Sequence, residues 1–185
     1  MNSAIKDGGL ISHEPCGPPC FFGFYVNDDF KSAVETLNDI HSTENVATSC
    51  VLDKSEVFQQ IRCPGVRISS ELESNEILGI EFSVDSQVTV EALIDTYGEP
   101  TSLEVFDLLD VHNPSMRMRL LYQDFWGVIF LEIQPLIEDY HVEPTTLVEK
   151  VDYLTEADYI QLSEGTIPWR GYGYYGITST LDFSE

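Results

Sequence analysis

The stretch Ile77–Pro100, ILGIEFSVDSQVTVEALIDTYGEP, decides the predicted fold because the earlier stretch Phe21–Ile40 repeats its pattern. The two align without a gap at a constant offset of 56 residues. A fixed period of this size is typical of supersecondary units that bury their apolar faces only by packing on one another. The identical pairs are Gly23 with Gly79, Asp29 with Asp85, Val34 with Val90, Glu35 with Glu91, Leu37 with Leu93 and Asp39 with Asp95.

Each copy is predicted to contain an amphipathic helix. In Asp28–Ser42, apolar residues recur at steps of three and four, which places them on one side of a helix. In the second copy, Thr89 is a suitable N-cap, and Gly98 followed by Pro100 ends the helix. The apolar stripe of the first helix consists of Phe30, Ala33, Val34, Leu37, Ile40 and His41.

Antiparallel strands are predicted after both helices. Alternating or continuous apolar runs bounded by turn residues are the pattern of such strands. The run Thr145–Leu154 fits a strand or a helix, and its β-branched residues favour the strand. The Thr155–Ser163 stretch is predicted to be a helix with Thr155 as its cap. The other predicted strands are Cys50–Leu52, Glu56–Cys63, Val66–Ser70, Ile77–Ser83, Ser102–Leu109, Met116–Tyr122 and Trp126–Ile133.

These elements predict an α+β protein of two tandem helix-plus-antiparallel-sheet repeats with a C-terminal strand–helix extension. We expect residues 16–165 to form one compact unit. The expected divisions are a flexible leader at 1–15, the first repeat at 16–84, the second repeat at 85–135, and at 136–185 an extension that carries a glycine- and aromatic-rich loop.

The chain of 185 residues carries a formal charge of −23, unevenly divided into −5 over Met1–Gly65 and −18 over Val66–Glu185. A field of this sign repels phosphate backbones and so excludes nucleic-acid binding by counterion release. The simplest interpretation is an acidic, soluble surface. The alternative is a polyanion mimic that inhibits a nucleic-acid-binding protein, although the acids are scattered and form no dense double row.

The four cysteines, an even number, fit a disulfide framework of an oxidising compartment, with three pairings open. Cys16 and Cys20 are close enough for a local disulfide, and a bridge between Cys50 and Cys63 would tie a strand to the loop after the first helix. The alternative, a zinc site at Cys16 and Cys20 with a histidine, lacks a nearby fourth ligand. We expect no metal and no cofactor. No signal segment or membrane span is evident, so the chain is either a processed exported form or cytoplasmic.

Two resemblances accompany this pattern. The segment Tyr97–Pro100 (Tyr-Gly-Glu-Pro), followed by a three-stranded meander, is similar to the SmpA-type outer-membrane assembly lipoproteins and to the β-lactamase inhibitory protein fold. The Pro19–Phe24 segment (Pro-Cys-Phe-Phe-Gly-Phe) resembles the start of a family of uncharacterised exported bacterial proteins or lipoproteins. The resemblance covers Cys16–Ile133 and implies an extracellular or envelope setting and protein binding. It supplies no catalytic residue. Because the second unit of this chain lacks cysteines, the resemblance to the β-lactamase inhibitory protein fold does not imply the inhibitory activity.

No Gly-rich phosphate loop, His-Glu-x-x-His, Gly-x-Ser-x-Gly or EF-hand pattern occurs in the chain. Acid pairs such as Asp107 and Asp110 arise by chance among 32 acidic residues. We therefore expect a protein that is not an enzyme. The alternative is a hydrolase whose acids converge in a cleft with perturbed pKa values.

The function predicted from the sequence is that of an exported or envelope-associated binding or scaffold protein, which recognises an unidentified protein partner through a sheet face and aromatic loops. The aromatic loop residues either grip a partner or pack against the sheet edge. The two arginines of one strand either neutralise acids across the sheet or line a binding surface. The candidate binding residues are Tyr122, Phe125, Trp126, Trp169, Tyr172, Tyr174, Arg117 and Arg119.

Overall fold

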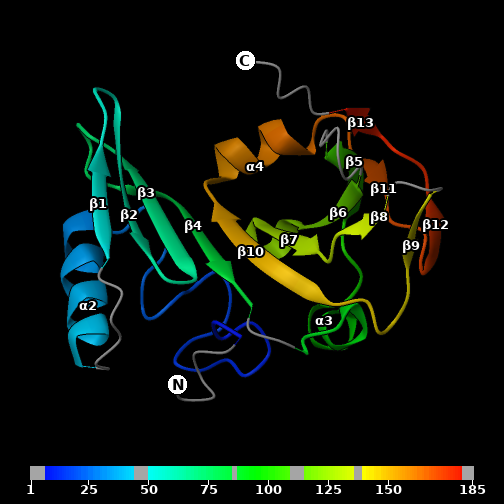
Figure 1. Ribbon diagram of the computed structural model, residues 1–185, viewed down its shortest axis with the longest axis horizontal. Coiled ribbons are helices and arrows are strands. Elements are labelled where there is room, and N and C mark those ends of the chain that lie inside the picture. Colours follow the sequence, from blue (N-terminus) through cyan, green and yellow to red (C-terminus); the bar gives the residue numbers. More distant parts are fainter. Residues whose placement is uncertain (1–6, 44–49, 85–86, 109–114, 136–138, 181–185) are drawn as a thin grey trace.

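The computed structural model describes residues 7–43, 50–84, 87–108, 115–135 and 139–180. Within these residues, eleven strands form one sheet in the order β1-β2-β3-β4-β10-β7-β6-β5-β11, with β13 paired to β5 and β8 paired to β6 (Figure 1). A separate pair joins β12 to β9. All neighbours in the large sheet are antiparallel except β13 and β5.

Two meanders of consecutive strands make up most of the sheet. The first follows helix α2 (Phe30–Thr43), and the second follows helix α3 (Val90–Tyr97). The strands of the meanders are β1 (Val51–Lys54), β2 (Phe58–Cys63), β3 (Val66–Glu71), β4 (Ile77–Ser83), β5 (Ser102–Leu108), β6 (Ser115–Tyr122) and β7 (Gly127–Leu131), with the 3-10 turn η1 (Gln123–Phe125) before β7.

The last quarter of the chain returns to the sheet. Strand β10 (Val148–Leu154) enters between β4 and β7, and helix α4 (Glu156–Ser163) follows it. The remaining strands are β8 (Gln134–Pro135), β9 (Tyr140–Val142), β11 (Ile167–Pro168), β12 (Gly173–Tyr175) and β13 (Ser179–Thr180).

The predicted α+β fold of two tandem helix-plus-sheet repeats is wrong. The described part of the chain is dominated by one continuous sheet, with three α-helices of 14, 8 and 8 residues. The matched stretches also differ in structure, because Phe21 and Phe24 close a tight turn where the second copy contains β4. The two predicted amphipathic helices are present as α2 and α3. Strand β10, however, pairs with both β4 and β7 and so joins the two expected sheets into one.

The main core lies on one face of the sheet, which we call the core face. Helix α2 places Phe30, Ala33 and Leu37 in this core, and α3 adds Val90 and Leu93. Each large apolar side chain that is fully buried contributes roughly 1.5–3 kcal/mol relative to an exposed one. The core face is therefore the part of the sheet that holds the fold together.

The start of the described chain also packs on the core face. Leu10 is fully buried in the core. The Asp7 carboxylate accepts hydrogen bonds from the backbone N–H groups of Gly9, Ile11 and Ser12, at 3.0, 3.0 and 2.7 Å. Residues 7–15 of the predicted flexible leader are thus tied to the sheet. The domain divisions expected from the sequence stay predictions.

Both predicted disulfides are present. Cys16 is bonded to Cys20, and Cys50 is bonded to Cys63, which links the start of β1 to the end of β2. The prediction of a disulfide framework is therefore confirmed. Among the described residues, no helix is long and apolar enough to cross a membrane.

Candidate binding face

The second face of the sheet, which we call the outer face, carries charged side chains on neighbouring strands. Residues that are paired across antiparallel strands point to the same face. The registers pair Arg67 of β3 with Glu81 of β4 and pair Glu81 with Asp152 of β10. On the other side of β10, Lys150 pairs with Phe130 of β7, and Phe130 pairs with Arg119 of β6. These side chains form a band across five strands, in which Asp152 and Lys150 stand two residues apart on β10.

Strict alternation along the strands creates this face. In β10, Val151 and Tyr153 are fully buried on the core face, so that Lys150 and Asp152 point to the outer face. Strand β6 follows the same pattern over Met116–Leu120, in which Arg117 and Arg119 alternate with buried apolar side chains.

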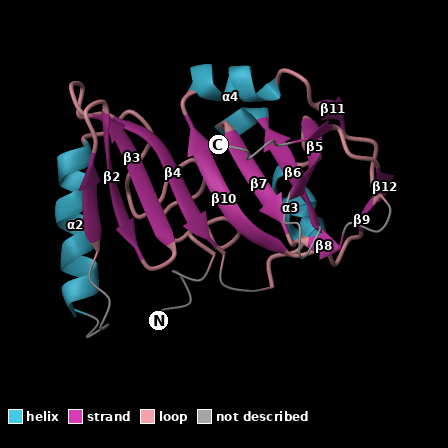
Figure 2. Cartoon of the chain, turned by 45° about the horizontal axis from the view of Figure 1, so that its top comes forward, coloured by secondary structure: helices cyan, strands magenta, loops and turns pink. Residues whose placement is uncertain are grey.

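Helix α4 covers only one end of the outer face. Phe106, Val128 and Phe130 form a small second core there, and Leu162 of α4 packs against it. Figure 2 shows α4 across the end of β10 and β7, while no helix among the described residues crosses the outer face of β1 to β4. Among the described residues, the outer face of β1 to β4 is therefore open to a partner, whereas the Lys150 and Asp152 side chains on β10 are only partly exposed.

The centre of the outer face is a network of ion pairs around Lys150. The ammonium group lies 2.9 Å from a Glu81 carboxylate oxygen and 3.6 Å from an Asp152 oxygen, and it sits 4.1 Å from the centre of the Phe130 ring. The Arg67 guanidinium is 2.5 Å from the same oxygen of Glu81. Both cations share one carboxylate, which fixes their side chains in place.

Further pairs lie on both sides of this centre. Arg117 donates to Glu149 at 2.7 Å. Arg119 donates through Nε to Glu104 at 2.6 Å and lies against the ring of Phe106. At the edge of the sheet, β2 and β1 are joined by the pair Arg62–Asp53, with 2.7 Å between Nε and the carboxylate oxygen.

The ion-paired charges of the outer face balance one another, although the protein as a whole is strongly acidic. It holds five of the nine lysines and arginines of the chain, paired with five acids. Because these ten charges balance, the net charge of −23 comes from residues outside these ion pairs. The basic residues are Arg62, Arg67, Arg117, Arg119 and Lys150, and the acids are Asp53, Glu81, Glu104, Glu149 and Asp152.

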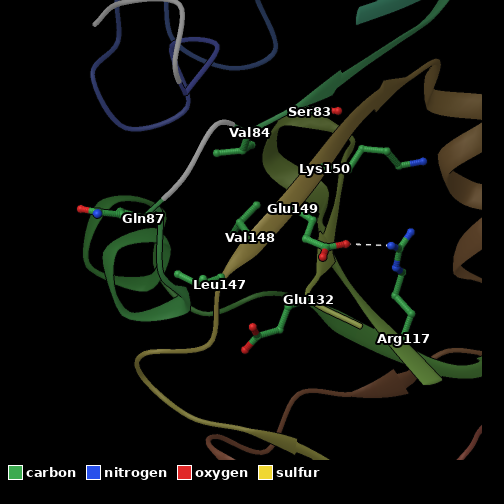
Figure 3. A pocket seen from close by; sticks show the side chains of 9 residues that line it. All are labelled: Ser83, Val84, Gln87, Arg117, Glu132, Leu147, Val148, Glu149 and Lys150. Carbon is green, nitrogen blue, oxygen red and sulfur yellow. Dashed lines mark hydrogen bonds and ion pairs between the residues drawn. The ribbon is translucent and has the colours of Figure 1, made fainter. Parts of the chain in front are cut away.

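Two hollows indent this face beside Lys150. The larger, of about 460 Å³, lies where β10 bulges between Val148 and Lys150. In Figure 3, Arg117 and Glu149 meet at one side of it, and Glu132 points away from that pair. The Nε of Arg117 is buried and has no hydrogen-bond partner among the described residues. The smaller hollow, of about 80 Å³, is lined by Arg67, Ser69, Gly79, Ile80, Glu81, Asp152 and Leu154.

Among the ion-paired acids of this face, Asp152 has the pKa that is shifted furthest from its ordinary value. Burial raises the pKa of Asp152 to about 6, with Lys150 lowering it and Glu81 raising it to smaller extents. One of its carboxylate oxygens is buried without a hydrogen-bond partner among the described residues. A carboxylate in this position gains a proton at a mildly acidic pH, which removes one negative charge from the face.

We expect Asp152→Asn to remove a pH dependence of stability. The folded protein binds this proton more tightly than the unfolded chain, whose ordinary pKa is 3.8. Stability is therefore lost as the pH rises from about 4 to 6, by up to about 3 kcal/mol. Urea titrations at pH 4 and pH 7 should show a larger decrease in unfolding free energy for wild type than for Asp152→Asn. Ser69→Ala, a neutral change in the same hollow, should keep the wild-type decrease, and equal decreases in all three proteins would contradict the assignment.

The structure separates the predicted aromatic residues. Tyr122 and Phe125 are buried, with exposed fractions of 3% and 6%, and their rings stack 5.3 Å apart in the main core. Trp126 is half-buried and lines a third hollow, of about 160 Å³, beside α4. Tyr122 and Phe125 therefore offer no surface to a partner in this structure.

The glycine- and aromatic-rich loop is partly packed and partly exposed. Trp169 is half-buried and stacks 5.9 Å from the ring of Tyr175. Tyr172 and Tyr174 are 43% and 63% exposed, and Tyr174 stacks on His141 at 4.2 Å. Of the six predicted aromatic residues, these two are the most accessible. Their role in binding stays a prediction.

The two predicted arginines lie on the outer face, but sequence reasoning missed Arg67, Glu81, Lys150 and Asp152, which form its centre. Their signal was the alternation of charged and apolar residues in β3, β4 and β10. The order of strands, which brings β10 next to β4, was not available from this alternation.

No protein-family model, curated protein or solved structure matches this chain. The resemblance to exported lipoproteins and to the inhibitory-protein fold therefore stays an expectation from the sequence.

Proposed function

We propose that this is a non-enzymatic, exported binding or scaffold protein that recognises a protein partner on the outer face of its sheet. The observation that carries the proposal is the charge-balanced network centred on the partly exposed Lys150 and continued by the exposed Arg67. A partner that docks there meets no net repulsion from the contact surface, while the acidic remainder of the chain disfavours non-specific contacts elsewhere.

The geometry of the network supports specific recognition. Its side chains are held by ion pairs and by stacking on Phe130 and Phe106, so less conformational entropy is lost when a partner orders them. The hollow beside Arg117 can receive a projecting group, and the buried Nε of Arg117 offers a hydrogen bond that is not yet made. Such prearranged polar groups around a hollow favour one partner over another.

The two disulfides support the exported setting. Disulfide bonds persist in extracellular and envelope compartments and are rare in the reducing cytoplasm. All four cysteines of the chain are paired in the structure. The same bonds hold the chain start and the β1–β2 edge, so an oxidised protein is the form to use in binding experiments.

The test compares two charge reversals that change the net charge equally. Arg67→Glu alters the outer face, whereas Lys31→Glu alters an exposed position of α2. Oxidised wild type and both variants are immobilised and exposed to an envelope and secreted-protein fraction. We expect one partner to be retained by wild type and Lys31→Glu and reduced at least tenfold by Arg67→Glu.

Thermal unfolding of both variants shows whether they remain folded. A partner retained equally by all three proteins would place the contact away from the outer face. Tyr172→Ala and Trp126→Ala extend the test to the predicted aromatic contacts, and a loss of the partner with these variants but not with Arg67→Glu would overturn the proposal.

A further inference from the structure

A group of exposed apolar side chains lies at the outer end of the β1–β2 hairpin. Val57 is 70% exposed, Phe58 48% and Leu72, in the turn between β3 and β4, 40%. The backbone N–H of Leu72 donates to the carbonyl of Val57 at 3.0 Å, so the two turns lie side by side. We call Val57, Phe58 and Leu72 the hairpin tip.

Hydrogen bonds hold the hairpin tip in a defined conformation. The Ser55 hydroxyl accepts from the N–H of Phe58 at 3.0 Å and donates to the carbonyl of Phe58 at 3.0 Å, which closes the turn. Phe58 pairs with Glu71 across β2 and β3. Apolar side chains held outward in this way lose little entropy when a partner covers them.

Acidic side chains surround the hairpin tip. Glu56, Glu71 and Glu73 are exposed, and none forms an ion pair with another described residue. On the same sheet, in contrast, Asp53, Glu81, Glu104, Glu149 and Asp152 are each paired with a cation. The hairpin tip is therefore an apolar centre with an unbalanced negative rim, which is the arrangement of a docking site with a charged rim.

We propose that the hairpin tip docks against an apolar segment flanked by lysine and arginine side chains on a partner protein. This inference deepens the proposed function by naming the chemistry of the partner, and it rests on that function. Charge complementarity favours such an occupant, because three unpaired carboxylates at the rim attract lysine and arginine side chains. A second copy of this chain is disfavoured, since its own rim and its net charge of −23 would be repelled.

Peptide arrays provide a defined probe for this proposal. One set of 12-residue peptides has an apolar centre flanked by lysine and arginine, a second has the same centre flanked by aspartate and glutamate, and a third is flanked by serine. Labelled, oxidised protein should bind a subset of the first set. Binding to that subset should weaken at least tenfold in Phe58→Ser and in the double variant Glu71→Gln, Glu73→Gln.

The matched control variants make the same kinds of substitution at exposed positions away from the hairpin tip. Ile160→Ser alters an apolar side chain of α4 that is 54% exposed, and Glu91→Gln with Asp95→Asn removes two exposed acids of α3. Both controls should bind as wild type does. Equal loss in controls and tip variants would show general attraction to positive charge and would overturn the proposal, as would preferred binding to the serine or acidic sets.

Two further results separate this inference from the proposed function. If Arg67→Glu abolishes capture of the partner while Phe58→Ser leaves it unchanged, the outer face binds and the tip does not. A dimer in sedimentation velocity that Phe58→Ser dissociates would instead assign the tip to self-association. Either result rejects the basic-partner proposal, and the first does so while the outer-face proposal stands.

Discussion

Replacing Phe82 with alanine is expected to lower the free energy of unfolding by about 3–5 kcal/mol. Phe82 of β4 is 2% exposed and lies where three parts of the chain meet. Its ring stacks on Phe21 at 4.7 Å and lies 5.5 Å from the ring of Tyr153 in β10. Removing it leaves a cavity between the chain start and the two strands that join the meanders, so the loss combines buried area and vacated contacts.

Urea denaturation of oxidised wild type and Phe82→Ala measures this loss. Phe58→Ala is the matched control, since the same ring is removed from a position that is half exposed, and its effect should stay below about 1 kcal/mol. A decrease below 1 kcal/mol for Phe82→Ala would mean that the Phe21–Phe82–Tyr153 junction does not form as described.

The elements of this fold were more predictable from the sequence than their arrangement. The spacing of Phe30, Ala33 and Leu37 correctly indicated α2, and the Thr89 cap correctly indicated the start of α3, where Thr89 Oγ1 accepts from the N–H of Ala92 at 3.3 Å. Such signals are local, because caps and helical spacing are set by residues a few positions apart. Strand pairing is set by residues far apart, and nothing in the local pattern of Val148–Leu154 specified β4 and β7 as its neighbours.

The candidate binding face shows the same limit. Arg117 and Arg119 stood out in the sequence because basic residues are scarce, and the alternation of β6 placed them on one face. The ion pair between Lys150 and Glu81 could not be predicted from the sequence, because 69 positions separate the two residues. The aromatic residues misled for a physical reason, because a tyrosine or phenylalanine beside a turn packs inward or outward according to the rings around it. Tyr122 and Phe125 pack inward, where their rings contact the ring of Tyr97.

The second large effect is expected for Gly9→Ala, which should destabilise the protein by several kcal/mol and release the chain start. Gly9 has a φ of +82°, and a Cβ built there would lie 2.1 Å from the carbonyl oxygen of Cys16. That oxygen belongs to the backbone of a loop closed by the Cys16–Cys20 bond, so it has little freedom to move. Alanine therefore meets both an unfavourable backbone conformation and a steric clash.

Gly23→Ala separates these two causes. Gly23 has a φ of +86°, but no atom lies within 4 Å of its would-be Cβ, so this variant reports the backbone cost alone, about 1–2 kcal/mol. Hydrogen exchange should show that Gly9→Ala also loses protection at Leu10 and Ile11, because Leu10 can no longer remain fully buried while the loop moves. If Gly9→Ala cost no more than Gly23→Ala and wild type itself showed no protection at Leu10 and Ile11, residues 7–15 would be the flexible leader that the sequence predicts, and they would not cover the core face.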